Sequence, residues 1–477
     1  MASKKTLNAD NLETLGAARL AELLIEVSEG NAATKRRLRL ELAGAESPAE
    51  VAKQIRKRLA TIARSRSFVD WQNRKSLVDD LDTTRRAIVE QVATRSPAEA
   101  LDLMWRFLEL ANGVFGRCDD SSGTVGDVYH TAVADLGAVA GSARPDPKQL
   151  ADQVFSSLLQ NDYGQFDGLI QSLQPALAHV GLEYLKQRMI ALSAEPIRKP
   201  AANKREVVGW GPRGAIYADD IAERSRVSTI RLALQEIADA QGDVDSFIAQ
   251  YEKPVRKVPK IAAEIARRLL GAGRSDEAWQ AIEATEHQRG GWPDFEWEDA
   301  RIDILEVLGR GDDAQVARWS CFERGLSLRH LREYLQRLPE FDDFEAEERA
   351  LGYAERYGSL LEAISFLVSW PALERAARTV IRRVTDLEGN YYEILAPAAE
   401  ALAAKYPLAA TLLLRAMIDF SLTQARASRY GHAARHLRDC AGLAPTIDYG
   451  SFETHEAYVN RLRREHGRKA AFWTMVS

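Results

Sequence analysis

Three residues that could bind a metal recur at four-residue intervals near the C-terminus. His432, His436 and Cys440 share one face of a predicted helix. Imidazole and thiolate groups suit zinc, and two histidines four residues apart can chelate one ion. A closed tetrahedral site needs a fourth ligand, which the sequence does not supply, and Cys440 lies between Leu437 and Leu443. We therefore expect a half-buried hairpin helix with a core cysteine, and no metal or other cofactor.

The loop that begins Cys118-Asp119-Asp120 could suggest a reactive thiol or a calcium site. An EF-hand loop needs Gly at its sixth position and Glu at its twelfth. Counted from Asp119, these positions hold Thr124 and His130, so the calcium pattern fails. We expect the Asp and Ser side chains of this loop to cap the helix that follows.

Two further segments could bind ligands through glycines or aromatic rings. Gly209-Trp210-Gly211-Pro212-Arg213-Gly214 fits the dinucleotide pattern G-x-G-x-x-G, but that motif works only between a strand and a helix. Residues 194–214 are rich in Pro and Gly, which predicts a hinge or linker, and the alternation over Glu206 to Val208 is too short to predict a strand. The aromatic residues of 292–297 are typical of packing between repeat helices.

Basic residues are concentrated near the N-terminus. Residues 31–75 contain twelve Lys or Arg against four acids, and they include the cluster Lys35-Arg36-Arg37-Leu38-Arg39. The cations Lys53, Arg56, Lys57 and Arg64 lie opposite an apolar stripe on one predicted helix, so we expect them to be exposed. Such a face could contact phosphates and bind nucleic acid in a salt-dependent way. It could equally be a solvated outer face, or a surface that pairs with the acidic residues 340–348 of the same chain.

Sequence signals for helices occur along the whole chain. The predicted helices must therefore position any functional site. Ser47-Pro48-Ala49-Glu50 is a capping box with Pro at the first helical position. Val51, Ile55, Leu59 and Ile62 then recur at helical spacing, which predicts one buried face. The same tetrapeptide returns at residues 96–99. We expect an all-α fold whose core includes Ile55, Leu59, Trp105, Leu269, Leu305 and Leu413.

Internal repeats indicate how the helices are organised. Residues 273–278 (GRSDEA) are echoed by residues 309–314 (GRGDDA), an offset of 36, and residues 240–243 resemble both turns. In each copy Gly ends one helix, Asp caps or charges the start of the next, and a small Ala permits close helix packing. This pattern predicts a tetratricopeptide-like α-solenoid of stacked helical hairpins. We expect four parts: a helical region with a basic face (1–145), a helical segment ending in a Pro/Gly-rich linker (146–205), the repeats (206–340) and C-terminal hairpins (341–477).

Several segments carry a family resemblance. Residues 118–128, 143–147, 242–245 and 273–278 resemble, in the same order, the helical region that follows the finger of bacterial SWIM zinc-finger proteins. The C-terminal block, with His455-Glu456-Ala457-Tyr458-Val459 and His466-Gly467-Arg468-Lys469, resembles an uncharacterised bacterial family of unknown function that shares this region. The finger itself needs Cys-x-Cys followed by Cys-x-His, which this sequence lacks. The resemblance therefore implies a helical-repeat scaffold without the zinc finger.

Composition narrows the function classes. The chain has 477 residues, of which 46% are hydrophobic, which excludes wholesale disorder. A net charge of -5 excludes a histone-like protein, and three cysteines exclude a disulfide framework. No apolar run is long enough to span a membrane, and the N-terminus lacks the apolar core of a signal peptide, so we expect a cytoplasmic protein.

These observations favour a non-enzymatic scaffold for protein–protein interaction. A helical hairpin array without a nucleophile elbow, P-loop or Ser-His-Asp order usually presents a surface for proteins or peptides. The alternative is a nucleic-acid-associated accessory protein that uses the basic face. A hydrolase whose site is assembled from distant residues is a remote third hypothesis.

Overall fold

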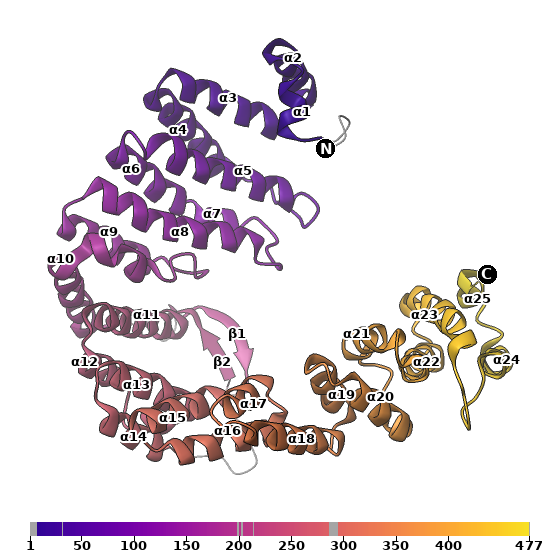
Figure 1. Ribbon diagram of the computed structural model, residues 1–477. Helices are drawn as coiled ribbons and strands as arrows, with labels where there is room; N and C mark the ends of the chain where they lie inside the picture. The colour runs from indigo at the N-terminus through magenta and orange to yellow at the C-terminus, as the bar shows by residue number, and fades with distance from the viewer. Residues whose placement is uncertain are drawn as a thin grey trace. The chain divides into compact units, whose positions relative to one another are not determined.

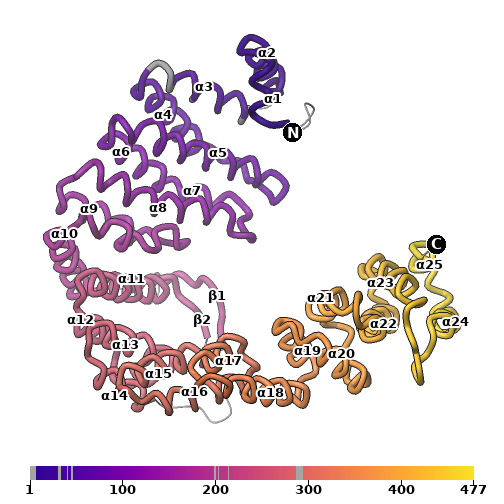
Figure 2. Tube along the Cα trace, in the orientation of Figure 1, coloured from indigo at the N-terminus to yellow at the C-terminus, as the bar shows by residue number. Residues whose placement is uncertain are grey.

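The computed structural model describes residues 7–30, 32–197, 200–201, 204–212, 214–285 and 294–476. These residues are mostly helical, which confirms the all-α class at the coarse level (Figure 1). The chain forms two compact units, residues 1–252 and 253–477. Within each unit the chain turns back from one helix to the next (Figure 2). The Pro/Gly-rich segment 194–214 lies inside the first unit, and the four-part division stays a prediction.

The N-terminal unit consists of helices and one small sheet. Its helical elements are α1 (Ala9–Glu13), α2 (Ala17–Ser28), α3 (Ala32–Glu46), α4 (Pro48–Arg64), α5 (Arg74–Ala87), the π-helical η1 (Ile88–Val92), α6 (Pro97–Leu108), α7 (Ala111–Phe115), α8 (Thr124–Ala143), α9 (Pro147–Leu158), α10 (Leu169–Ala194), α11 (Ala218–Gln241) and α12 (Val244–Ala249).

In the C-terminal unit, every regular element among the described residues is a helix. Its elements are η3 (Val255–Lys257), α13 (Pro259–Gly271), α14 (Ser275–Glu283), α15 (Phe295–Val307), α16 (Gly311–Gly325), α17 (Leu328–Leu335), α18 (Asp342–Glu355), α19 (Leu360–Ser369), α20 (Leu373–Arg382), η4 (Val384–Asp386), α21 (Tyr392–Ala403), α22 (Pro407–Thr423), η5 (Ala427–Arg429), α23 (Tyr430–Leu443), η6 (Ala444–Thr446), α24 (His455–His466) and α25 (Ala470–Val476).

Local sequence signals explain several helix ends. The Ser47 side chain accepts a hydrogen bond from the Glu50 N–H at the start of α4, as the capping box predicts, whereas Ser96 makes no such bond at α6. Before α8, the Asp120 carboxylate accepts from the Val125 and Gly126 N–H groups at 2.9 Å each. The acidic loop after Cys118 therefore caps a helix, as predicted.

The repeated glycine turns share one geometry. Gly242, Gly273 and Gly309 all have φ near +70°, which glycine tolerates best. In each turn the next residue's N–H donates to a carbonyl five residues earlier, at 2.8–2.9 Å, which satisfies an otherwise free carbonyl of the helix end. The alanines after the last two turns, Ala278 and Ala314, are fully buried, as expected of small residues between packed helices.

One segment departs from the predicted linker. The strands β1 (Val207–Gly211) and β2 (Gly214–Tyr217) pair with each other in an antiparallel manner, so discounting a strand here was wrong. β-branched and aromatic residues on both sides of a short turn favour pairing despite the weak alternation. Arg205 lies over the Tyr217 ring and pairs with Asp219 and Asp220, so it ties the hairpin to the start of α11.

The apolar stripes form a separate core in each unit. The largest clusters of buried side chains extend from α3 to α11 in the first unit and from α16 to α25 in the second. Every predicted core position is buried: Ile55, Leu59, Trp105, Leu269, Leu305 and Leu413. Of the aromatic segment 292–297, residues 292 and 293 lie outside the described chain, whereas Trp297 is buried and bonds the Thr285 hydroxyl at 3.0 Å.

Candidate functional site

The predicted basic face lies on α4 and is exposed at all four positions. Two of its cations are paired: Lys53 with Glu50 at 2.9 Å and Arg56 with Glu99 at 2.7 Å. Among the described residues, Lys57 and Arg64 have no carboxylate partner, and the Arg64 Nε–H donates to a backbone carbonyl of its own helix. The net positive charge of this face is thus smaller than the sequence suggests, because carboxylates neutralise two of its four cations.

The histidine and cysteine face of α23 packs as predicted. Cys440 is fully buried, His436 is half-buried and His432 is exposed. Burial raises the pKa of Cys440 to about 12, which keeps this thiol protonated near neutral pH. Within the described part of the chain, no group of three or more His, Cys, Asp or Glu side chains could hold a metal ion.

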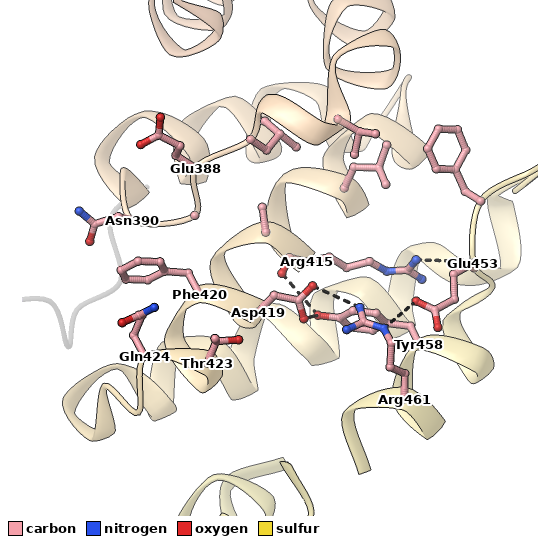
Figure 3. A pocket seen from close by; sticks show the side chains of 16 residues that line it. Glu388, Asn390, Arg415, Asp419, Phe420, Thr423, Gln424, Glu453, Tyr458 and Arg461 are labelled. Atoms are coloured by element: carbon pink, nitrogen blue, oxygen red, sulfur yellow. Dashed lines mark hydrogen bonds and ion pairs between the residues drawn. The ribbon is translucent and has the colours of Figure 1, made fainter. Parts of the chain in front are cut away.

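A pocket of about 550 Å³ lies in the C-terminal unit, and we call it the C-terminal pocket. It is built by the segment 384–390, by α22, by the segment before α24 and by α24 itself. Figure 3 shows Arg415, Asp419, Tyr458 and Arg461 gathered at one end, and Asn390, Phe420 and Gln424 at the other. Its volume lies within the range usual for ligand pockets. Elements that are more than 70 residues apart in the sequence pack together to form the pocket, so no local sequence motif indicates it.

Arg415 is the central side chain of the polar end. It comes from α22, is only 6% exposed, and its Nη1 donates to the Glu453 carbonyl at 2.7 Å. Its guanidinium carbon lies 4.4 Å from the centre of the Tyr458 ring and 5.5 Å from that of Tyr449. No described carboxylate pairs with it. The two aromatic faces therefore stabilise part of the buried positive charge, whereas the Nε and Nη2 atoms of Arg415 are buried and have no hydrogen-bond partner among the described residues.

A second charge network closes the same end. The Tyr458 hydroxyl donates to Asp419 at 3.0 Å, and Arg461 pairs with Asp419 at 3.2 Å and with Glu453 at 3.3 Å. Burial, and then the Asp419 charge, raise the pKa of Tyr458 above its usual range, which keeps its hydroxyl protonated as a donor. Although burial opposes its charged form, Asp419 and Glu453 raise the pKa of Arg461. The network fixes α22, α24 and the segment between residues 448 and 454 to one another.

The opposite end is shaped by an unusually close backbone contact. A Cβ atom added to Gly389 would lie 1.9 Å from the Ala416 carbonyl oxygen and 2.8 Å from the Phe420 Cβ. Only glycine lets the 384–390 segment approach α22 this closely. This segment contributes Leu387 and Asn390 to the pocket wall, and Asn390 lies at the same end as Phe420 (Figure 3).

The lining combines an apolar wall with hydrogen-bonding groups. Val384, Leu387, Leu412 and Phe452 supply apolar surface, whereas Thr423 and Gln424 offer donors and acceptors. The Asn390 side-chain oxygen already accepts from Arg429 at 3.1 Å, so Asn390 offers mainly its amide N–H groups. Such a lining can hold an apolar side chain and bond the amide groups beside it. One sequence signal could have indicated it: Arg415 interrupts the apolar run 412–418 of α22, and a buried arginine is rare.

The sequence matches the family of unknown function DUF6880 over residues 2–475. The chain belongs to this family. The predicted relationship to an uncharacterised family of unknown function is thereby confirmed. No curated protein matches the DUF6880 chain, and no solved structure does. In the described part of this DUF6880 chain, no helix has both the length and the apolar character needed to cross a membrane.

Proposed function

We propose that this chain is a non-enzymatic helical-repeat scaffold that binds a protein partner through a short peptide segment. The packing pattern supports a tetratricopeptide-like stacked-hairpin arrangement: helices pack mainly on neighbours in the chain, such as α13 on α14 and α15, α15 on α16, and α22 on α21 and α23. Such arrays place binding surfaces on successive helices. The resemblance to the SWIM-associated helical region and the cytoplasmic location stay predictions.

The C-terminal pocket is the observation that carries this proposal. A rigid polar end, fixed by Arg415, Tyr458 and Arg461, faces an apolar wall in a cavity of about 550 Å³. Preorganised groups lower the entropic cost of ordering a bound segment. We infer that an apolar side chain of the partner enters the pocket while Asn390 and Gln424 bond its backbone.

Peptide display tests this function. Random peptides selected on the wild-type protein should converge on a motif with an apolar residue. The Thr423→Trp variant fills the pocket from an exposed position. It should weaken the selected peptides about tenfold or more, because roughly one apolar side chain can no longer be buried.

A matched variant guards against a general surface effect. Thr446 is exposed in the same unit but does not line the pocket, so Thr446→Trp should retain full peptide affinity. Failure to select any peptide motif would contradict peptide docking in this pocket. An equal loss of peptide affinity in Thr423→Trp and Thr446→Trp would contradict it as well.

Nucleic-acid association is the second candidate function. It is favoured by the exposed Lys57 and Arg64, which lack carboxylate partners among the described residues. Binding would show as salt-sensitive retention of DNA or RNA at low ionic strength. Partners that a pull-down recovers after nuclease treatment favour the protein scaffold, whereas partners that disappear on nuclease treatment favour this alternative.

A further inference from the structure

A second pocket, which we call the basic pocket, lies between α3, α4 and α5 in the N-terminal unit. Its volume is about 260 Å³. Arg36 and Arg39 from α3 and Lys57 and Arg58 from α4 line it, and Asp80 from α5 is the one acid of its lining. Four cations and one carboxylate leave a formal charge of +3 in this small space. Like charges held so close are stabilised when an anion binds between them.

Asp80 holds two of these cations in place. It is buried, and its two carboxylate oxygens accept from the Nε atoms of Arg36 and Arg58 at 2.9 Å each. The bonds fix both guanidinium groups while the Nη atoms of Arg36 make no hydrogen bond to any described residue. Arg39 and Lys57 are exposed and have no carboxylate partner in the described part of the chain. The pocket therefore presents cationic donors that its own acid does not neutralise.

The lining selects among anions. Thr61 and Thr84 donate to carbonyls of their own helices, so the donors available to a ligand are the arginines, the lysine and the neutral side chains of Gln54 and Thr83. Several convergent donors match the three or four acceptor oxygens of a phosphate group better than the two of a carboxylate. The lining contains no aromatic side chain on which a base could stack, and its volume is below that of most small-molecule sites.

We propose that the basic pocket binds a phosphate group, recognised through its charge and oxygens and not through the molecule that carries it. The site is independent of peptide docking in the C-terminal pocket, because it lies in the other unit and uses none of the same residues. Two sources share this chemistry: free phosphate or a small phosphate ester, and the backbone of a nucleic acid.

The test measures binding of inorganic phosphate to the full chain. Calorimetry and thermal unfolding are carried out in phosphate and in chloride at equal ionic strength. Phosphate should bind and raise the unfolding midpoint of the wild type above its value in chloride. The double variant Arg39→Gln/Lys57→Gln should weaken phosphate binding about tenfold or more, since it removes two charge-assisted hydrogen-bond donors.

The control variant removes the same number of charges outside the pocket. Lys53→Gln/Arg64→Gln changes exposed residues of α4 that do not line the cavity, so it should bind phosphate like the wild type. Asp80→Asn should lower the midpoint in chloride and increase the gain that phosphate brings, because Arg36 and Arg58 lose their internal anion. The proposal would be overturned if the wild type unfolded at the same temperature in phosphate and in chloride. It would also be overturned if both double variants lost the same phosphate affinity.

A second arm identifies the source of the phosphate. A nucleoside monophosphate and a short single-stranded oligonucleotide are titrated into the same variants. Comparable affinity for phosphate and the mononucleotide, with no gain for the oligonucleotide, supports a small phosphate ligand. A tighter oligonucleotide complex that Lys53→Gln/Arg64→Gln also weakens supports the nucleic-acid backbone.

Discussion

The carboxyl group of Glu236 shows how burial sets chemistry at the scale of one residue. Glu236 lies on α11, and burial, reinforced by Asp167 and Asp239, raises its pKa to about 7. The unfolded chain releases this proton near pH 4.5, so stability falls as the pH rises from 4.5 to 7. The full cost above pH 7 is on the order of 3 kcal/mol. Glu236→Gln should therefore raise the urea midpoint at pH 8 and leave it unchanged at pH 4.5.

An exposed carboxylate provides the comparison for that prediction. Glu109 is exposed at the end of α6, so Glu109→Gln should change the urea midpoint little at either pH. A Glu236→Gln variant that is equally stabilised at both pH values would show that protonation is not the cause.

The hydroxyl of Tyr458 is a second single-group test. Tyr458→Phe removes the hydrogen bonds from this buried hydroxyl to the half-buried Asp419 carboxylate and to the Arg415 carbonyl. We expect a loss of about 1–2 kcal/mol in the free energy of unfolding. Tyr392→Phe, at an exposed position, should change stability by less than about 0.5 kcal/mol. If a denaturant titration showed equal losses of unfolding free energy in the two variants, the Tyr458 hydroxyl would not stabilise the charge network.

At the scale of elements, the close approach of Gly389 to α22 makes a sharp prediction. Gly389→Ala inserts a Cβ where the Ala416 carbonyl already lies, so the 384–390 segment must move. We expect a loss of about 1–3 kcal/mol in stability, as for overpacked cores, together with weaker peptide binding. Gly442→Ala in α23 meets nothing within 4 Å and should leave stability equal or higher. Calorimetric unfolding of the two variants distinguishes these outcomes.

The elements also show what the sequence could and could not predict. Ser47 and Gly273 act through neighbours a few residues away, so local spacing predicts their cap and turn. The pairing of β1 with β2 escapes prediction because the alternation of each strand is short and the ladder depends on contacts between the two strands. The C-terminal pocket could not be predicted at all. Arg415, Gly389 and Tyr458 are separated along the chain, and only tertiary packing brings them together.

At the scale of the whole molecule, charge pairing decides how the basic face behaves. Changing Lys53, Arg56, Lys57 and Arg64 together to Gln should preserve the fold, because all four are exposed. If the face binds nucleic acid, the slope of log K against log salt should fall by about 0.7–0.9 for each phosphate that the variant no longer neutralises. Lys57 and Arg64 should dominate this effect, since Lys53 and Arg56 already pair with Glu50 and Glu99.

The protein-scaffold hypothesis predicts a different outcome for that variant. The quadruple change should leave every protein partner bound, and no DNA or RNA phenotype should follow. A wild-type protein that shows no salt-sensitive binding to any DNA or RNA at low ionic strength would exclude the nucleic-acid hypothesis.

Hydrogen–deuterium exchange with a display-selected peptide tests the central claim most directly, because it locates binding on the whole chain. We predict new protection confined to residues 384–390, 412–424 and 452–461, the segments that line the C-terminal pocket. This protection should be absent in Thr423→Trp and present in Thr446→Trp. Protection that falls elsewhere in the chain, or none at a peptide concentration that saturates binding, would contradict peptide docking in the C-terminal pocket.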